Sequence, residues 1–148
     1  MNELQDLYRE VILDHNRNPR NFHEMANADR VIDGINPLCG DKMKLYVKLA
    51  NDRIEDISFQ GTGCAISVAS SSLMTERVKG MSIQDSLALY EVIHSVLTGA
   101  KESPPAELEK LAALAGVREF PSRVKCASLG WHALKSALVG EQQPVSTE

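Results

Sequence analysis

A stretch of alternating apolar and polar residues constrains the fold more than any other feature of the chain. In "KMKLYVKLA", residues 42–50, every second side chain is apolar, which indicates a strand with one buried face. The Asn-Asp pair at 51–52 supplies a tight turn, because both residue types tolerate the left-handed backbone conformation. The following "RIEDISFQG", residues 53–61, returns as the partner strand, and the extra residue between Ile54 and Ile57 predicts a β-bulge.

The elements around this hairpin predict the fold class. Residues 30–37, "RVIDGINP", are expected to form a third, earlier strand. Helical periodicity or helix-end signals mark five further segments: 2–19, 64–80, 82–99, 106–116 and 126–140. We expect a single-domain α+β fold in which a small three-stranded antiparallel sheet packs against several helices. The domain is predicted to span residues 1–140, with residues 141–148 as a flexible C-terminal tail.

The composition excludes some classes of function. The chain has 148 residues, 43% hydrophobic and 24% charged, as in one globular domain. A net charge of −4 argues against sequence-independent nucleic-acid binding, which needs a basic excess. The opening "MNELQDLYRE" lacks the apolar region of a signal peptide, and the uncharged run 57–75 is too polar for a membrane span. We therefore expect a soluble, cytoplasmic protein whose partners are neither nucleic acid nor membrane.

The placement of the three cysteines, Cys39, Cys64 and Cys126, points to a shared site. An odd number of cysteines cannot form a closed disulfide set, which leaves metal ligation, catalysis or plain burial as their uses. A single cysteine is most often a small buried hydrophobic residue. These three, however, lie at predicted element boundaries, and Cys64 and Cys126 are each expected to open a helix. A helix N-terminus and a nearby cation both lower the pKa of a thiol, so we expect reactive thiolates.

Asp41 completes a candidate ligand set. In an extended chain residues i and i+2 point to the same side, so Cys39 and Asp41 can reach one point. Three thiolates and one carboxylate suit tetrahedral zinc, and the same thiolates could instead hold an iron–sulfur cluster. Lys42, Arg123 and Lys125 lie nearby in the sequence and could balance the negative charge. A carboxylate is the less favoured ligand beside soft thiolates, so the sequence predicts a site that opens by ligand exchange.

Long motifs surround these residues: "NPLCGDKMKL" at 36–45, "GTGCAISVASSSLMTERVKG" at 61–80 and "RVKCASLGWHAL" at 123–134. They resemble the cysteine motifs of the IscU/SufU family of iron–sulfur cluster assembly proteins, whose domain is NifU N-terminal-like. "LYREVILDHNRNPRN", residues 7–21, resembles the N-terminal helix of that family. The resemblance extends over residues 4–140.

Departures from the scaffold-type IscU pattern resemble the SufU branch. Scaffold-type members carry a histidine directly before the last cysteine, whereas Lys125 precedes Cys126 here. Their "LPPVK" chaperone-recognition stretch corresponds to "FPSRVK" in this chain, and the region 83–115 is longer than in the scaffold branch.

This resemblance implies a function and a set of roles. It implies zinc held by four side chains: Cys39, Asp41, Cys64 and Cys126. It implies a sulfurtransferase-like protein that accepts persulfide sulfur from a PLP-dependent cysteine desulfurase and serves downstream iron–sulfur assembly proteins. A histidine of the desulfurase would take one zinc position. Cys39 is then the expected sulfur acceptor, and Arg123 is expected to support the site electrostatically.

Other readings stay open at this point. The chain could be an iron–sulfur cluster scaffold, or a structural zinc-binding interaction module without sulfur chemistry. A hydrolase with a cysteine nucleophile is disfavoured, because no histidine is placed as its base. We expect His15 to be a solvated residue and His132 to lie on the surface of the last helix.

Overall fold

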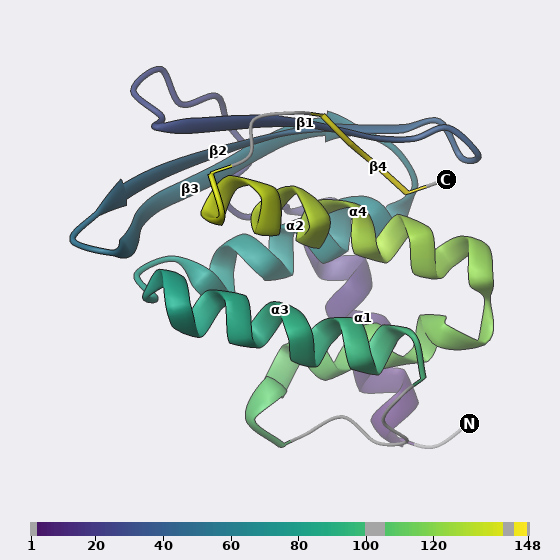
Figure 1. Cartoon of the computed structure of the whole chain (residues 1–148). Helices are drawn as coiled ribbons and strands as arrows, with labels where there is room; N and C mark the ends of the chain where they lie inside the picture. The colour runs from purple at the N-terminus through teal and green to yellow at the C-terminus, as the bar shows by residue number, and fades with distance from the viewer. Residues whose placement is uncertain (1–2, 100–105, 141–143, 148) are drawn as a thin grey trace.

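The computed structural model describes residues 3–99, 106–140 and 144–147. Its elements are, in chain order, α1 (Glu3–Arg17), β1 (Arg30–Asn36), β2 (Asp41–Ala50), β3 (Arg53–Thr62), α2 (Ala65–Val78), α3 (Ile83–Leu97), the 3₁₀ helix η1 (Ala106–Glu119), α4 (Pro121–Leu138) and β4 (Val145–Ser146). Figure 1 shows a twisted sheet with all the labelled helices on one side of it, which confirms the predicted α+β class. No helix among the described residues is both long and apolar enough to cross a membrane.

The predicted hairpin forms the centre of the sheet. The strand order is β3-β2-β1-β4, and β2 pairs antiparallel with both β1 and β3. Asn51 and Asp52 form the turn with φ of 53° and 61°, in the left-handed region that the sequence predicted. The register shifts beside Lys48, which faces Asp56, while the next residue, Leu49, faces Ile54. This shift is the predicted bulge.

A fourth strand corrects the prediction of three antiparallel strands. Val145 and Ser146 pair in parallel with Gly34 and Ile35 of β1, and Thr147 N donates to Ile35 O at 3.1 Å. These residues belong to the segment 141–148 that was predicted to be a flexible tail, of which 141–143 and 148 lie outside the described residues. A strand this short shows no apolar alternation, so its sequence offers no strand signal.

The helices form two layers below the sheet in Figure 1. α2 and α4 pack directly on the sheet, and α1, α3 and η1 pack against those two helices. Alternate residues of β2, including Leu45 and Val47, point into this interface and are fully buried, as is Trp131 of α4. The opposite face of the sheet is not covered by helices, and Lys42 and Lys44 lie exposed there. One-sided burial explains the alternation in the sequence.

The last long helix begins earlier than predicted. α4 starts at Pro121, and Cys126 therefore lies inside the helix instead of opening it. Proline is favoured in the first turn of a helix because its missing N–H has no partner to lose there. The predicted helix at 106–116 is the 3₁₀ helix η1, which is interrupted at Glu109 by a φ of 52°.

Small residues bring α2 and α4 unusually close together. Ser70 Oγ donates to Ala127 O at 2.7 Å and accepts from Trp131 Nε1 at 3.2 Å. A Cβ atom built on Gly130 would lie 2.5 Å from Ser71 Oγ. Ser70 and Ser71 of α2 thus allow the close packing against α4.

Gly130→Ala should destabilise the protein, because the added methyl group overlaps Ser71 Oγ, and overpacking typically costs about 1–3 kcal/mol. With Ser71→Ala present, the same substitution should cost little, since the next contact, Ser71 Cβ at 3.4 Å, is an ordinary one. Urea unfolding of the wild type, both single variants and the double variant measures this coupling. An equal cost of Gly130→Ala in both backgrounds would contradict the close approach.

His15 is buried, which corrects the expectation of a solvated residue. Its Nδ1 lies 2.7 Å from Ser72 Oγ, which accepts from Arg20 N at 2.8 Å. Its Nε2 faces Glu76 Oε1 at 3.8 Å. Burial lowers the pKa of His15 below 6.5, and the nearby charges of Arg20 and Lys110 add to this effect, while Glu76 opposes it. The neutral ring therefore joins α1 to α2.

Replacing His15 should change how stability depends on pH. The unfolded chain binds a proton at His15 near pH 6.5, whereas the folded protein binds it only at lower pH. The wild type should therefore lose stability as pH falls from 6.5 through the lower folded pKa, and His15→Asn should lose less over that window. Urea unfolding between neutral pH and pH 5 measures both slopes. Parallel curves for the two proteins would show that His15 is not held neutral by the fold.

Candidate metal and thiol site

The turn between β1 and β2 and the starts of α2 and α4 lie at one end of the sheet, on the right in Figure 1. Cys39 lies in the turn between β1 and β2, and Asp41 is the first residue of β2. Cys64 follows β3 and precedes α2, and Cys126 lies in the first half of α4. Elements that are distant in the sequence therefore deliver these side chains to one place.

The distances place these side chains within reach of one another. Cys126 Sγ lies 3.4 Å from Cys39 Sγ, and Cys64 Sγ lies 3.9 Å from Asp41 Oδ2. Ligand atoms of Cys39, Asp41 and Cys126 all lie within 4.8 Å of one another. The structure therefore groups three of the four predicted ligands, Cys39, Asp41 and Cys126, while Cys64 lies outside that group and reaches it through its contacts with Asp41. Metal binding by these residues stays a prediction.

Asp41 is the most constrained member of the group. Its side chain is 0% exposed, and its Oδ1 accepts a hydrogen bond from Cys64 N at 2.8 Å. Gly63 makes this contact possible, because a Cβ atom there would lie 2.5 Å from Asp41 Oδ1. Gly63, the second glycine of the "GTG" motif, thus leaves room for the carboxylate of Asp41.

Cys64 is fixed by the helix that it opens. It is the N-cap of α2, with φ −70° and ψ 164°, and its Sγ accepts from Ser67 N at 3.4 Å. A thiolate at this position faces the positive end of the helix dipole. The prediction that Cys64 begins a helix is confirmed.

Cys126 differs from the sequence-based expectation. It is 2% exposed, and Asn36 Nδ2 lies 3.5 Å from its Sγ. Burial raises the pKa of the Cys126 thiol far above its usual value, and hydrogen bonds with Asp41, Cys39 and Cys64 raise this pKa further. The expected lowering by a helix N-terminus is wrong, because the helix begins at Pro121.

Cys39 is the exposed thiol of the group. It precedes Gly40, whose φ of +72° a residue with a side chain rarely adopts. Cys39 N and Gly40 N both donate to Asn36 O, at 3.3 and 2.9 Å, which closes the turn. The preceding Leu38 is 67% exposed. Cys39 is therefore the sulfur that an external molecule can reach.

The donor set fits a cation. Among the described residues, no lysine or arginine forms an ion pair with the buried carboxylate of Asp41. A buried carboxylate beside three sulfurs is costly unless a positive charge compensates it. A thiophilic divalent metal ion would supply that charge.

The three cations predicted to balance the site are Lys42, Arg123 and Lys125. Arg123 is exposed, and its guanidinium carbon lies 4.9 Å above the centre of the Phe120 ring. Lys42 is exposed on the sheet, and Lys125 is partly buried in α4. The electrostatic role of Arg123 therefore stays a prediction.

Sequence reasoning missed Asn36 and His132. Asn36 is the first residue of the "NPLCGD" motif, and this position is the only feature of the sequence that points to a role for it. His132 is not a free surface residue, because its Nδ1 lies 2.9 Å from Tyr90 OH on α3. Burial, His94 and Lys135 all lower the pKa of His132, and nothing in its position connects it to the cysteines.

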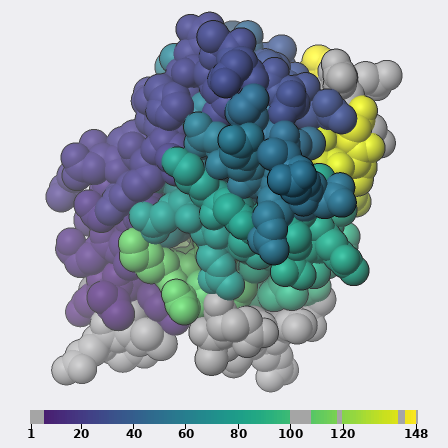
Figure 2. All heavy atoms as spheres, turned by 90° about the vertical axis from the view of Figure 1, so that its left-hand side faces the viewer, coloured from purple at the N-terminus to yellow at the C-terminus, as the bar shows by residue number. Residues whose placement is uncertain are grey.

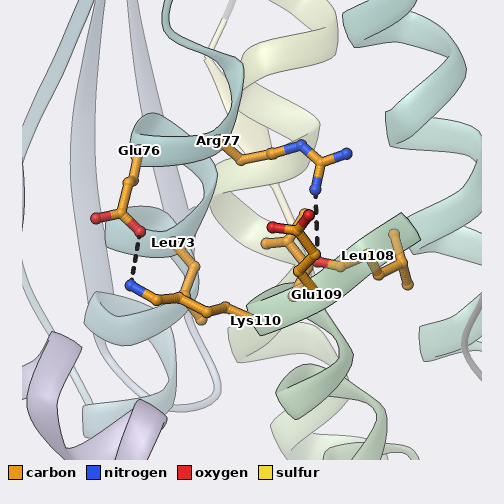
Figure 3. A pocket seen from close by; sticks show the side chains of 7 residues that line it. Leu73, Glu76, Arg77, Leu108, Glu109 and Lys110 are labelled. Carbon is orange, nitrogen blue, oxygen red and sulfur yellow. Dashed lines mark hydrogen bonds and ion pairs between the residues drawn. The ribbon is translucent and has the colours of Figure 1, made fainter. Parts of the chain in front are cut away.

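A charged hollow of about 230 Å³ lies at the other end of α2. Figure 2 shows the green atoms of η1 between the purple atoms of α1 and the teal atoms of α2. In Figure 3, Lys110 Nζ donates to Glu76 Oε1 at 3.1 Å, and Arg77 Nη1 donates to Leu108 O at 3.4 Å. Lys110 and Glu76 thus pair with each other, and Arg77 binds a backbone carbonyl. About 18 Å of helix rise separates Glu76 from Cys64. The hollow is not part of the cysteine site.

Fold and site together define a small α+β protein with three cysteines and an aspartate at one end of its sheet. The model of the NifU-like N terminal domain matches residues 7–139, so the chain belongs to that family. This result confirms the resemblance found in the sequence motifs.

Relatives and a solved structure agree with this assignment. The chain is 42% identical to the zinc-dependent sulfurtransferase SufU of Bacillus subtilis over 94% of both chains. It is 41% identical to the iron–sulfur cluster assembly scaffold protein IscU of Streptococcus pyogenes, covering 93% of this chain and 86% of that protein. A crystal structure of a candidate SUF-system scaffold protein from Fervidobacterium islandicum has 32% identity and a TM-score of 0.82, covering 87% of this chain and 94% of the other.

Gly63→Ala should weaken metal binding, because its methyl group would displace the carboxylate of Asp41. Disturbing an interaction that orients a ligand typically lowers metal affinity about 10–100-fold. Gly116→Ala is the matched control, since within the described part of the chain a Cβ there meets nothing within 4 Å. Competition with a chelator, with Co²⁺ as an optical probe, measures both affinities. Equal affinities for the two variants would show that Asp41 is not a ligand.

Proposed function

We propose that this chain is a zinc-dependent sulfur-transfer protein that accepts persulfide sulfur from a cysteine desulfurase for iron–sulfur cluster assembly. Family membership and similarity to SufU of Bacillus subtilis, a zinc-dependent sulfurtransferase by name, support the general role. One observation carries the mechanism: Cys39 is exposed, while the other proposed ligands are held by hydrogen bonds inside the fold.

Zinc would be held by Cys39, Asp41, Cys64 and Cys126. When bound, zinc would keep the sulfurs as thiolates near neutral pH and compensate the buried negative charge. Burial raises the pKa of the Cys126 thiol, and a bound zinc ion would oppose this effect by stabilising the thiolate.

Sulfur transfer would occur at Cys39. Asp41 accepts from Cys64 N, Cys64 accepts from Ser67 N, and Cys126 lies against Asn36. Among the described residues, the Cys39 side chain hydrogen-bonds only with Cys126. Cys39 also stands on an exposed turn with Gly40 in the left-handed conformation, so its sulfur can move with the smallest disturbance.

The transfer step balances without an external oxidant or reductant. The Cys39 thiolate attacks the outer sulfur of the persulfide on the partner. A new S–S bond forms at Cys39 Sγ, the S–S bond in the partner breaks, and the partner cysteine leaves as a thiolate. The exposed Leu38 would contact the partner beside the attacking sulfur.

The partner in this proposal is a PLP-dependent cysteine desulfurase, and later iron–sulfur assembly proteins would receive the sulfur. A histidine of the desulfurase would replace Cys39 as a zinc ligand while the sulfur is transferred. Arg123, exposed in the first turn of the helix that carries Cys126, would favour the approach of anionic persulfide.

An iron–sulfur cluster scaffold is the second candidate. The identity of 41% to the scaffold protein IscU of Streptococcus pyogenes favours it, and the same side chains would hold the cluster. Anaerobic incubation with iron and sulfide followed by desalting distinguishes the two functions. A brown cluster that is retained and transferred to an apo-protein would support the scaffold function, and a colourless protein with bound zinc would oppose it.

Cys39→Ser should abolish sulfur acceptance while the fold is retained, because Cys39 is exposed and contributes little to the core. The chain is incubated with desulfurase and cysteine, alkylated, and analysed by peptide mass. In the wild type, the peptide with Cys39 should gain one sulfur atom. Asp41→Ala should still fold but with lower stability, and it should lower both zinc affinity and sulfur uptake.

Two outcomes would contradict the proposal. Added sulfur on Cys126 or Cys64 in the Cys39→Ser variant, at the wild-type level, would show that Cys39 is not the acceptor. Normal sulfur transfer by Asp41→Ala, with only its stability lowered, would favour a structural zinc-binding interaction module.

A further inference from the structure

Asn36 connects the exposed turn to the buried sulfur. It is the last residue of β1, and it is 0% exposed. Its backbone oxygen accepts from Cys39 N and Gly40 N at 3.3 and 2.9 Å. Its side-chain Nδ2 lies 3.5 Å from Cys126 Sγ. One residue therefore contacts both the thiol that is proposed to move and the thiol that is proposed to stay.

We propose that the Asn36 carboxamide is a positioning group that anchors Cys126 while Cys39 leaves the metal to accept sulfur. The inference rests on the proposed function, because it assigns different tasks to the two cysteines. Asn36 itself touches no reacting atom and acts only through Cys126.

The chemistry of the contact supports an anchor. A thiolate can only accept hydrogen bonds, and a carboxamide nitrogen offers donors without adding charge. Hydrogen bonds to an ionised acceptor are stronger than those between neutral groups, and such outer contacts orient metal ligands. A donor aimed at Cys126 Sγ therefore favours one position for this sulfur.

The rest of the Asn36 side chain shows that the amide is not placed there for another partner. Its Oδ1 is buried and makes no hydrogen bond within the described part of the chain. A buried amide oxygen without a partner is unfavourable, and an apolar side chain would avoid that penalty. The contact between Asn36 Nδ2 and Cys126 Sγ therefore explains why position 36 carries an amide side chain.

The backbone and the side chain of Asn36 have separable tasks. Any residue at position 36 would offer a carbonyl to Cys39 N and Gly40 N and so close the turn. Only the side chain reaches Cys126. Side-chain substitutions therefore test the anchor and leave the turn in place.

Asn36→Ala removes the donor, and Asn36→Asp replaces it with a carboxylate that repels thiolates. Asn51→Asp is the matched control, because it makes the same chemical change in the exposed turn between β2 and β3. Zinc affinity is measured by chelator competition. Iodoacetamide labelling of the metal-free protein, followed by peptide mass analysis, gives the reactivity of each cysteine.

Zinc affinity should fall about 10–100-fold in Asn36→Ala, further in Asn36→Asp, and not in Asn51→Asp. Labelling of Cys126 should rise severalfold in Asn36→Ala, while labelling of the exposed Cys39 stays at the wild-type rate. Wild-type zinc affinity together with wild-type labelling of Cys126 in both Asn36 variants would overturn the anchor.

Sulfur uptake from the desulfurase separates this inference from the proposed function. If the wild type accepts no sulfur but Asn36→Ala still exposes Cys126 to labelling, the function is wrong and the anchor stands. If the wild type accepts sulfur and both Asn36 variants behave like it in zinc affinity and labelling, the anchor alone is wrong.

A measurement on the wild type decides the case in which the variants fail to fold. In ¹¹³Cd-loaded, ¹⁵N-labelled protein, the hydrogen bond should give a scalar coupling between the metal and a carboxamide proton of Asn36. Absence of this coupling, with the Asn36 side-chain signals resolved, would overturn the anchor.

Discussion

The hydrogen bond from Cys64 N to Asp41 Oδ1, at 2.8 Å, joins the sheet to the helices at the functional end of the molecule. It gives one oxygen of a buried carboxylate a donor and occupies an N–H group at the start of α2. Gly63 leaves the space that this contact requires. This interaction ties the start of β2 to the start of α2, and so links two proposed ligands.

The site is asymmetric because its members come from different kinds of structure. Cys64 caps the start of α2, Cys126 lies inside α4, Asp41 begins a central strand, and Cys39 stands on a turn. Rigid elements hold a ligand more precisely than a turn does. A metal centre with one ligand on a turn can open at that ligand and keep the remaining geometry.

Much of this arrangement could be predicted from the sequence, and the failures have physical reasons. The alternation in β2 and the Asn-Asp turn predicted the central hairpin, because one face of the sheet is buried. The start of α4 lies five residues earlier than predicted, because Pro121 suits the first turn of a helix and leaves Cys126 inside it. His15 is polar among polar neighbours, yet helical spacing places it on the same face as Tyr8 and Ile12. Tertiary packing, and not local composition, decided its burial.

The short strand β4 lies beside Gly34 and Ile35, immediately before the residue that closes the turn of Cys39. It covers backbone groups of β1 that would otherwise offer a template for pairing with another polypeptide. β4 thus shields the edge of the sheet at the end that carries the Cys39 turn, where the proposed desulfurase would bind. If β4 detached, a strand from a second molecule could pair with β1 next to the turn that carries Cys39. Such self-association would compete with binding of the proposed partner.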